Sequence, residues 1–234
     1  MNIIYRPSTH YRKGRRTGTH ESLVGYVPDT IVIHYISAIN VDKNDPFNVD
    51  KVLDLLTKPI DDNGKLIRVS AHYAIDRTGQ VYQLVDNLDV AWHAGVSTMP
   101  DGRNYQGSCN EFSIGIELFG GNWIDFTDAQ YDSLIELTNE LKRRFVINEK
   151  NIVGHDAIAP GRKVDPGKRF DWKRYLSAVF PYDVQTVIEE NKSQAEESEK
   201  VYTNRTDGPV PVSNISSGES PSWLKRILRW FGLT

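Results

Sequence analysis

Three side chains of types that bind zinc occur where the sequence predicts strand ends or a turn. His34 follows the apolar run 31–33, and His155 follows the apolar run 152–153 and a glycine. Asp165 comes ten residues after His155. Functional side chains of α/β proteins gather at strand ends. Two imidazoles and one carboxylate, with a fourth position open to water, form the ligand set of a hydrolytic zinc centre.

The same spacing has a plainer interpretation. A histidine at a strand end more often makes a structural hydrogen bond, so both roles remain open for His34 and His155 on pattern alone. His10, His72 and His93 are further histidines of interest to which the spacing assigns no role.

Glu117 interrupts the strongly apolar run 113–119. A carboxylate in a buried strand is costly unless it is paired or placed in a cleft. Apolar surroundings would raise its pKa toward the value that a general base needs near neutral pH. The alternative is that the strand is half-exposed and Glu117 points to solvent, and the pattern favours neither interpretation.

The segment 30–180 alternates short β-rich runs with longer amphipathic runs, which is typical of an α/β domain. We therefore expect a single domain with a central mixed β-sheet flanked by helices. Strands are predicted at residues 31–35, 73–75, 81–85, 113–118 and 152–154.

Three helices are predicted from periodicity and end signals. The clearest begins at Thr127, with Asp128 in its first turn and three basic residues, 142–144, in its last, as the helix dipole favours. Shorter helices are predicted at 48–56, with Asn48 as a cap, and at 172–179, with Asp171 as a cap.

Composition narrows the class of protein. The chain has 234 residues and a formal net charge of −3, which gives no global reason to expect a nucleic-acid partner. A single cysteine, Cys109, excludes an intramolecular disulfide and favours a reducing compartment. The first 18 residues lack the apolar region of a secretory signal, so a cytoplasmic location is expected.

The composition changes after about residue 181. We predict an N-terminal extension (1–29), a main domain (30–182), a disordered flexible linker (183–220) and a short C-terminal amphipathic helix (221–234). The linker is first charged and then rich in Gly, Pro and Ser. The final segment places tryptophans and aliphatic residues on one face and basic residues opposite, a pattern typical of contact with an anionic membrane or lipopolysaccharide.

Five strings together carry a family resemblance: residues 31–34, 68–73, 92–97, 110–117 and 154–172. They resemble the type 2 N-acetylmuramoyl-L-alanine amidases, which share the fold of peptidoglycan recognition proteins. Within that family they are most similar to the cytoplasmic 1,6-anhydromuramoyl-L-alanine amidases of peptidoglycan recycling. The resemblance covers about two thirds of the chain, from Thr30 to Phe180.

The resemblance implies a zinc-dependent amidase that cuts between the lactyl group of N-acetylmuramic acid and the first L-alanine of the stem peptide. It implies one zinc ion (Zn²⁺) per chain, held by His34, His155 and Asp165. Glu117 and Lys163 would form the catalytic pair. Glu117 would pass a proton from water to the alanine nitrogen, and Lys163 would place its ammonium against the developing oxyanion. The role of Lys163 rests mainly on the family.

The chain departs from the family pattern at informative positions. Ala71 precedes His72 where many phage members have tyrosine, and Glu117 stands where they often have a non-acidic residue; both favour the recycling type. Ser108 stands where the recycling enzymes have an arginine that helps to hold the stem peptide, and Arg103 is the candidate replacement.

We predict a substrate-binding groove in which arginines meet the carboxylates of the stem peptide. Its lining is predicted to be Tyr35, Arg68, Trp92, Arg103 and Asn110.

Three functions stay open at this point. The first is a recycling amidase acting on soluble anhydromuropeptides, and the second is a lytic, endolysin-type amidase acting on polymeric peptidoglycan. The basic C-terminal segment favours the second, because such a segment is attracted to anionic surfaces; a phage enzyme could reach the wall through a holin. The third is a non-catalytic peptidoglycan-recognition module, which characteristically loses a zinc ligand that this chain retains.

Overall fold

A computed structural model describes residues 1–15, 27–58, 64 and 68–181 of the chain. These residues belong to one compact unit, Met1–Pro181. The predicted linker and C-terminal helix lie outside the described residues. Within the described part, none of the helices is long and apolar enough to cross a membrane.

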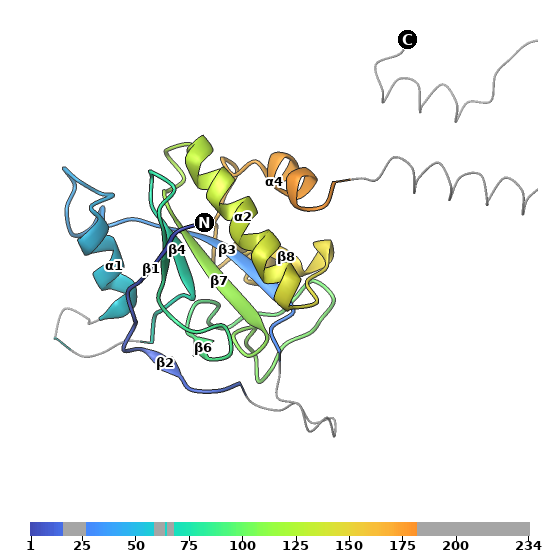
Figure 1. Cartoon of the computed structure of the whole chain (residues 1–234). Helices are drawn as coiled ribbons and strands as arrows, with labels where there is room; N and C mark the ends of the chain where they lie inside the picture. Colours follow the sequence, from blue (N-terminus) through green and yellow to red (C-terminus); the bar gives the residue numbers. More distant parts are fainter. Residues whose placement is uncertain (16–26, 59–63, 65–67, 182–234) are drawn as a thin grey trace, which may run out of the picture. The chain divides into compact units, whose positions relative to one another are not determined.

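A mixed six-stranded sheet forms the centre of this unit (Figure 1). Its order is β1 (Ile3–Tyr5), β5 (Val81–Gln83), β4 (Tyr73–Ile75), β7 (Ser113–Phe119), β3 (Thr30–Ile36) and β8 (Ile152–Gly154). The β4–β5 pair is antiparallel, and the other neighbours are parallel. The predicted α/β fold with a mixed central sheet is confirmed, as are all five predicted strands, with ends within two residues of those expected.

Alternation along the strands sends side chains to two different layers. Odd positions of β3 and even positions of β7, such as Ile33 and Ile116, pack into a core with α2 (Asp128–Arg144) and α4 (Trp172–Val179). The alternate positions face the other side, where α1 (Val49–Thr57) packs beside β4 and β5. Figure 1 shows α2 lying across one face of the sheet. His34 and Glu117 therefore project from the face opposite α2.

The three predicted helices begin where the sequence predicts, two of them at the predicted caps Asn48 and Asp171. Asn48 accepts from the Lys51 N–H, and Asp171 accepts from the Arg174 N–H. Thr127 forms a capping box with Gln130, whose side chain returns to the Thr127 N–H. Each cap satisfies backbone donors that have no partner in the first helical turn.

The described N-terminal residues form strands that the sequence analysis did not predict. β1 pairs with β5 at the edge of the sheet, and β2 (Tyr11–Arg12) pairs with β6 (Val90–Ala91) in a separate two-stranded sheet. β1 has the sequence Ile-Ile-Tyr, which does not alternate between apolar and polar residues, and all three positions are exposed. Its structure depends on backbone pairing with residues about 80 positions away, which local pattern does not reveal.

Two short helical elements were also not predicted. A 3₁₀ turn spans Glu149–Asn151, and α3 (His155–Ile158) follows β8 directly. α3 is a single turn, which is too short to show helical periodicity.

Candidate metal centre and active site

The sheet brings the predicted catalytic and metal-binding residues to one edge. His34 and Glu117 are paired neighbours in the parallel register of β3 and β7. His155 comes directly after β8, whose last residue pairs with Ile33. Side chains at paired positions of neighbouring parallel strands point to the same face, so the three groups lie together at the carboxyl ends of their strands.

A loop carries Asp165 back to the start of α3. The Asp156 N–H donates to the Asp165 carbonyl oxygen at 2.9 Å, and the Lys163 N–H donates to the Ala159 carbonyl oxygen at 3.0 Å. These two hydrogen bonds hold the loop between His155 and Asp165 closed, so that the Asp165 carboxylate lies next to the His155 ring.

His34, His155 and Asp165 form a nearly equilateral triangle of ligand atoms. The His34 Nδ1 to Asp165 Oδ2 distance is 2.9 Å, and the distances from His155 Nδ1 to Asp165 Oδ2 and to His34 Nδ1 are both 3.0 Å. All three residues are buried. Two imidazole nitrogens and a carboxylate at this spacing match a zinc donor set, in which each atom lies about 2.0–2.2 Å from the ion. The residues therefore fit the metal that the sequence predicts.

Charge in the triangle is arranged to suit a cation. Burial lowers the pKa of His34 to about 4, and the negative charge of Asp165 only partly opposes this effect, so the ring is neutral at pH 7 and can offer a lone pair. Burial by itself would raise the pKa of Asp165, but its contacts with His155 and His34 outweigh burial and lower the pKa below its usual value. A neutral imidazole and an ionised carboxylate are the forms that bind zinc.

Glu117 lies beside the triangle, buried within the apolar strand β7. Burial raises its pKa to about 8; the Asp165 charge adds to this effect, and the Lys163 ammonium opposes it. Among the described residues, nothing forms a hydrogen bond with its buried Oε2. A carboxyl group with a pKa near neutrality and a free oxygen is suited to take up and release a proton.

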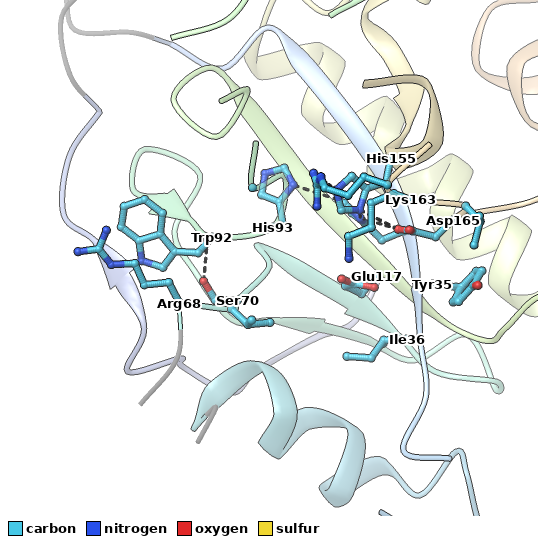
Figure 2. Close-up of a pocket in the computed structure, with 15 residues that line it drawn as sticks. Tyr35, Ile36, Arg68, Ser70, Trp92, His93, Glu117, His155, Lys163 and Asp165 are labelled. Atoms are coloured by element: carbon cyan, nitrogen blue, oxygen red, sulfur yellow. Dashed lines mark hydrogen bonds and ion pairs between the residues drawn. The ribbon is translucent and has the colours of Figure 1, made fainter. Parts of the chain in front are cut away.

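These groups line a cleft of about 520 Å³. Figure 2 shows Lys163 reaching toward Glu117, with Asp165 on one side and Arg68 and Trp92 on the other. The Arg68 guanidinium lies 5.2 Å from the Trp92 ring centroid, in a cation–π contact. The cleft is lined by His34, Tyr35, Ile36, Arg68, Val69, Ser70, Trp92, His93, Gly95, Glu117, His155, Arg162, Lys163, Val164 and Asp165.

Three of the five residues predicted to line a substrate groove lie in this cleft. Tyr35, Arg68 and Trp92 line the cleft, but Arg103 and Asn110 are not among its lining residues. The Arg103 guanidinium forms an ion pair with Asp29 and lies 4.6 Å from the Phe112 ring centroid.

Asn110 is buried, and its side chain is engaged with the backbone. Its Oδ1 accepts hydrogen bonds from the N–H groups of His93 and Ala94. Both Arg103 and Asn110 therefore make contacts within the domain, outside the lining of this cleft.

Two residues that contact the histidines of the triangle, His93 and Arg162, were given no role by the sequence analysis. His93 Nδ1 lies 3.0 Å from His34 Nε2, and Arg162 Nη2 lies 3.5 Å from His155 Nε2. The only local signal for either is its place inside a family string, next to Trp92 and Lys163 respectively. Their contacts join residues 59 and 7 positions apart, and these depend on the folded chain.

The family model described as N-acetylmuramoyl-L-alanine amidase matches residues 25–168. The chain belongs to this family.

Among relatives, the chain is similar to two proteins named 1,6-anhydro-N-acetylmuramyl-L-alanine amidase AmpD. It is 54% identical to that of Haemophilus influenzae over 116 residues, which is 48% of this chain and 60% of the relative. It is 42% identical to that of Citrobacter freundii over 163 residues, which is 66% of this chain and 82% of the relative.

Solved structures agree with this family. A crystal structure of a selenomethionine derivative of AmpD matches with a TM-score of 0.60 and 39% identity, covering 76% of this chain and 94% of that one. The Escherichia coli amidase AmiD, in complex with anhydro-N-acetylmuramic acid-L-Ala-D-gamma-Glu-L-Lys, matches with a TM-score of 0.53 and 25% identity, covering 92% of this chain and 83% of that one.

Proposed function

We propose that the protein is a zinc-dependent N-acetylmuramoyl-L-alanine amidase. The observation that carries the proposal is the buried triangle of His34, His155 and Asp165 beside a carboxyl group whose pKa is about 8. Family membership indicates which bond is cut, the amide between N-acetylmuramic acid and L-alanine. The triangle provides the ligand atoms for the metal. The finer assignment is one zinc ion per chain, with Glu117 and Lys163 as the catalytic pair.

The substrate that we propose is a soluble anhydromuropeptide of peptidoglycan recycling. The relatives from Haemophilus influenzae and Citrobacter freundii are named for 1,6-anhydro-N-acetylmuramyl-L-alanine, and the ligand in the AmiD complex is an anhydro-N-acetylmuramic acid peptide. The match spans only 60% of the length of the first of these relatives, so the substrate is part of the proposal.

Amide hydrolysis requires that a C–O bond forms, that the C–N bond breaks, and that a proton moves from water to the departing nitrogen. A zinc ion held by the triangle would supply Lewis acidity, which acidifies water and polarises a carbonyl. Glu117, in its ionised form, accepts the proton from the attacking water and then delivers it to the alanine nitrogen. Lys163 lines the same cleft and places its ammonium near the oxygen on which negative charge develops.

The peptide part of the substrate carries carboxylates, and the cleft offers complementary groups away from the triangle. Arg68, held against Trp92, is exposed and can donate two parallel hydrogen bonds to a carboxylate. Tyr35 lies beside Asp165 at the other end of the cleft. We assign substrate binding to Tyr35, Arg68 and Trp92.

Mass spectrometry of digests tests the proposal and separates the three functions. The protein should release the intact peptide from purified anhydromuropeptide, with turnover lost after chelation and restored by zinc. The matched assay uses intact sacculi at the same concentration of cleavable bonds.

Each outcome of that comparison assigns one function. Faster cleavage of the soluble substrate supports recycling, whereas faster cleavage of sacculi would replace it with the lytic function. Binding of either substrate without cleavage in the zinc-loaded protein would contradict the amidase and leave a recognition module.

A further inference from the structure

We propose that His93 and the carbonyl group of Ala94 set the tautomers of both histidines of the triangle and so aim their Nδ1 lone pairs at the metal position. His93 acts on His34, and Ala94 acts on His155. The inference rests on the proposed zinc centre for its purpose, but its evidence is the direction of hydrogen bonds within the protein. Both groups are positioning groups and not catalytic ones.

The chain of hydrogen bonds begins at a backbone carbonyl, which can only accept. The Ser113 hydroxyl donates its single hydrogen to the Cys109 carbonyl oxygen at 2.7 Å. Ser113 Oγ also lies 3.1 Å from His93 Nε2. Since the hydroxyl hydrogen is already used, Ser113 must accept in this second bond. His93 therefore carries its hydrogen on Nε2.

The next bond in the chain follows from that tautomer. A neutral imidazole has one donor and one acceptor nitrogen, so His93 Nδ1 accepts. Its partner at 3.0 Å is His34 Nε2, which must donate. His34 then has its hydrogen on Nε2, and its Nδ1 is left with a lone pair that faces the triangle. Four groups, from a carbonyl oxygen to the ligand atom, thus form one directed chain.

The tautomer of His155 is the same, and a single hydrogen bond determines it. Its Nε2 lies 3.1 Å from the Ala94 carbonyl oxygen, which can only accept, so Nε2 donates and Nδ1 keeps its lone pair. Arg162 donates to the same carbonyl at 2.8 Å and to that of Val96. A carbonyl oxygen has two lone pairs, so it can accept from both Arg162 and His155.

The backbone that carries these two groups is held in place. Asn110 Oδ1 accepts from the N–H of His93 at 3.2 Å and from that of Ala94 at 2.8 Å. The space for the imidazole exists because residue 115 is glycine: a Cβ atom there would lie 2.4 Å from Cγ of His93. The buried Asn110 amide thereby holds the backbone of both orienting groups, the His93 side chain and the Ala94 carbonyl, in place. Partners of this kind commonly change metal affinity 10- to 100-fold when they are removed.

Nitrogen NMR of the metal-free wild-type protein tests the tautomers without zinc and without activity. Long-range ¹H–¹⁵N correlations of ¹⁵N-histidine-labelled protein should show hydrogen on Nε2 in His34, His93 and His155. A predominant Nδ1–H form in His34 or His155 would overturn the proposal. Failure of the proposed amidase function would leave this result unchanged, so the two outcomes are distinguishable.

A pair of variants at position 93 tests the consequence for the metal. His93→Leu removes the acceptor, whereas His93→Asn places an amide oxygen near the position of Nδ1. Zinc affinity, measured by competition with a chromogenic chelator, should fall on the order of 10- to 100-fold in the leucine variant and recover at least in part in the asparagine variant. Equal affinities in the two variants, or a leucine variant within threefold of wild type, would contradict the proposal.

The amide that holds residues 93 and 94 provides a second pair. Asn110→Asp keeps the accepting Oδ1, and Asn110→Leu removes it at similar size. The leucine variant should bind zinc at least about fivefold more weakly than the aspartate variant. Circular dichroism melting identifies variants that are unfolded. If both leucine variants fail to fold, Ser113→Ala remains: the labelled protein should show His34 as a mixture of tautomers, and an unchanged His34 spectrum would count against the directed chain.

Discussion

The domain holds two buried groups of histidines and charged side chains on the same side of the sheet, and they differ in the direction of their hydrogen bonds. In the triangle of His34, His155 and Asp165, three accepting atoms face one another at 2.9–3.0 Å. In the second group, His72 Nδ1 accepts from the Gly115 N–H at 3.0 Å. The Arg15 guanidinium beside it donates to backbone carbonyls of residues 87, 110, 111 and 113.

Burial does not distinguish these two groups. His34 and His72 are 1% and 0% exposed, and burial lowers the pKa of both rings. What differs is that the Arg15 guanidinium donates to backbone carbonyl oxygens, which are complementary partners, although the buried Asn87 Oδ1 nearby has no partner among the described residues. The triangle instead gathers lone pairs that only a cation or protons would satisfy. Converging acceptors indicate a metal site, and paired donors and acceptors indicate structure.

The largest expected effect comes from breaking the triangle. His34→Ala, His155→Ala and Asp165→Ala should each lose tightly bound zinc and reduce turnover to assay background, because two remaining ligands hold zinc weakly. Elemental analysis after gel filtration gives the zinc content. His72→Ala is the matched control from the second group and should retain one zinc per chain. Stoichiometric zinc in all three triangle variants would remove the basis of the comparison.

Glu117→Gln should lower turnover by roughly 10²- to 10⁴-fold while zinc content stays at one per chain. The amide keeps the shape of the side chain but cannot accept the proton of the attacking water. Steady-state kinetics on anhydromuropeptide, together with zinc analysis of the same sample, measures both. Turnover within threefold of wild type would show that another group carries the proton.

The same substitution should change how stability depends on pH in the metal-free protein. The pKa of Glu117 is raised from 4.5 to about 8 by burial, so in this interval the folded state keeps a proton that the unfolded state has lost. Stability from this group is complete below pH 4.5 and is lost as the pH rises toward 8. Relative to wild type, Glu117→Gln should therefore gain up to about 1.4 kcal/mol per pH unit across the interval.

Urea unfolding of the metal-free wild type and Glu117→Gln at pH 5, 6.5 and 8 measures that difference. The other titrating groups contribute equally to the free energy of unfolding of both proteins, so their contributions cancel in the difference. A difference that does not vary with pH would mean that Glu117 is ionised throughout the range.

The smallest expected effect on the metal belongs to the second group. Arg15→Leu leaves several carbonyl oxygens without their donor and should lower the free energy of unfolding by about 2 kcal/mol, while zinc affinity changes less than threefold. Urea unfolding and chelator competition give the two numbers. Arg15→Lys retains the charge with fewer donors and should fall between wild type and leucine. A large loss of zinc affinity with little loss of stability would show that Arg15 and His72 belong to the metal site and not to a separate structural group.

The sequence by itself determined the features that depend on neighbouring residues. Short β-rich runs located the strands, and the helices begin at Asn48, Thr127 and Asp171 as predicted, because a cap binds N–H groups within three residues. For Glu117 the strand pattern left a buried and a half-exposed side chain open, and the structure shows the buried one, whose pKa is raised. The family strings brought together His34, His155 and Asp165, which lie within ligand distance in the structure.

The tertiary structure alone decided contacts between distant segments. Asn110 belongs to the same family string as Glu117, yet its side chain binds the backbone of residues 93–94, and Arg103 pairs with Asp29. The hydrogen-bond partners of the His93 and Arg15 side chains are 20 to 98 positions away. Which nitrogen of an imidazole carries the hydrogen depends on the acceptor that the fold places beside it, and residue type and spacing carry no information about that acceptor.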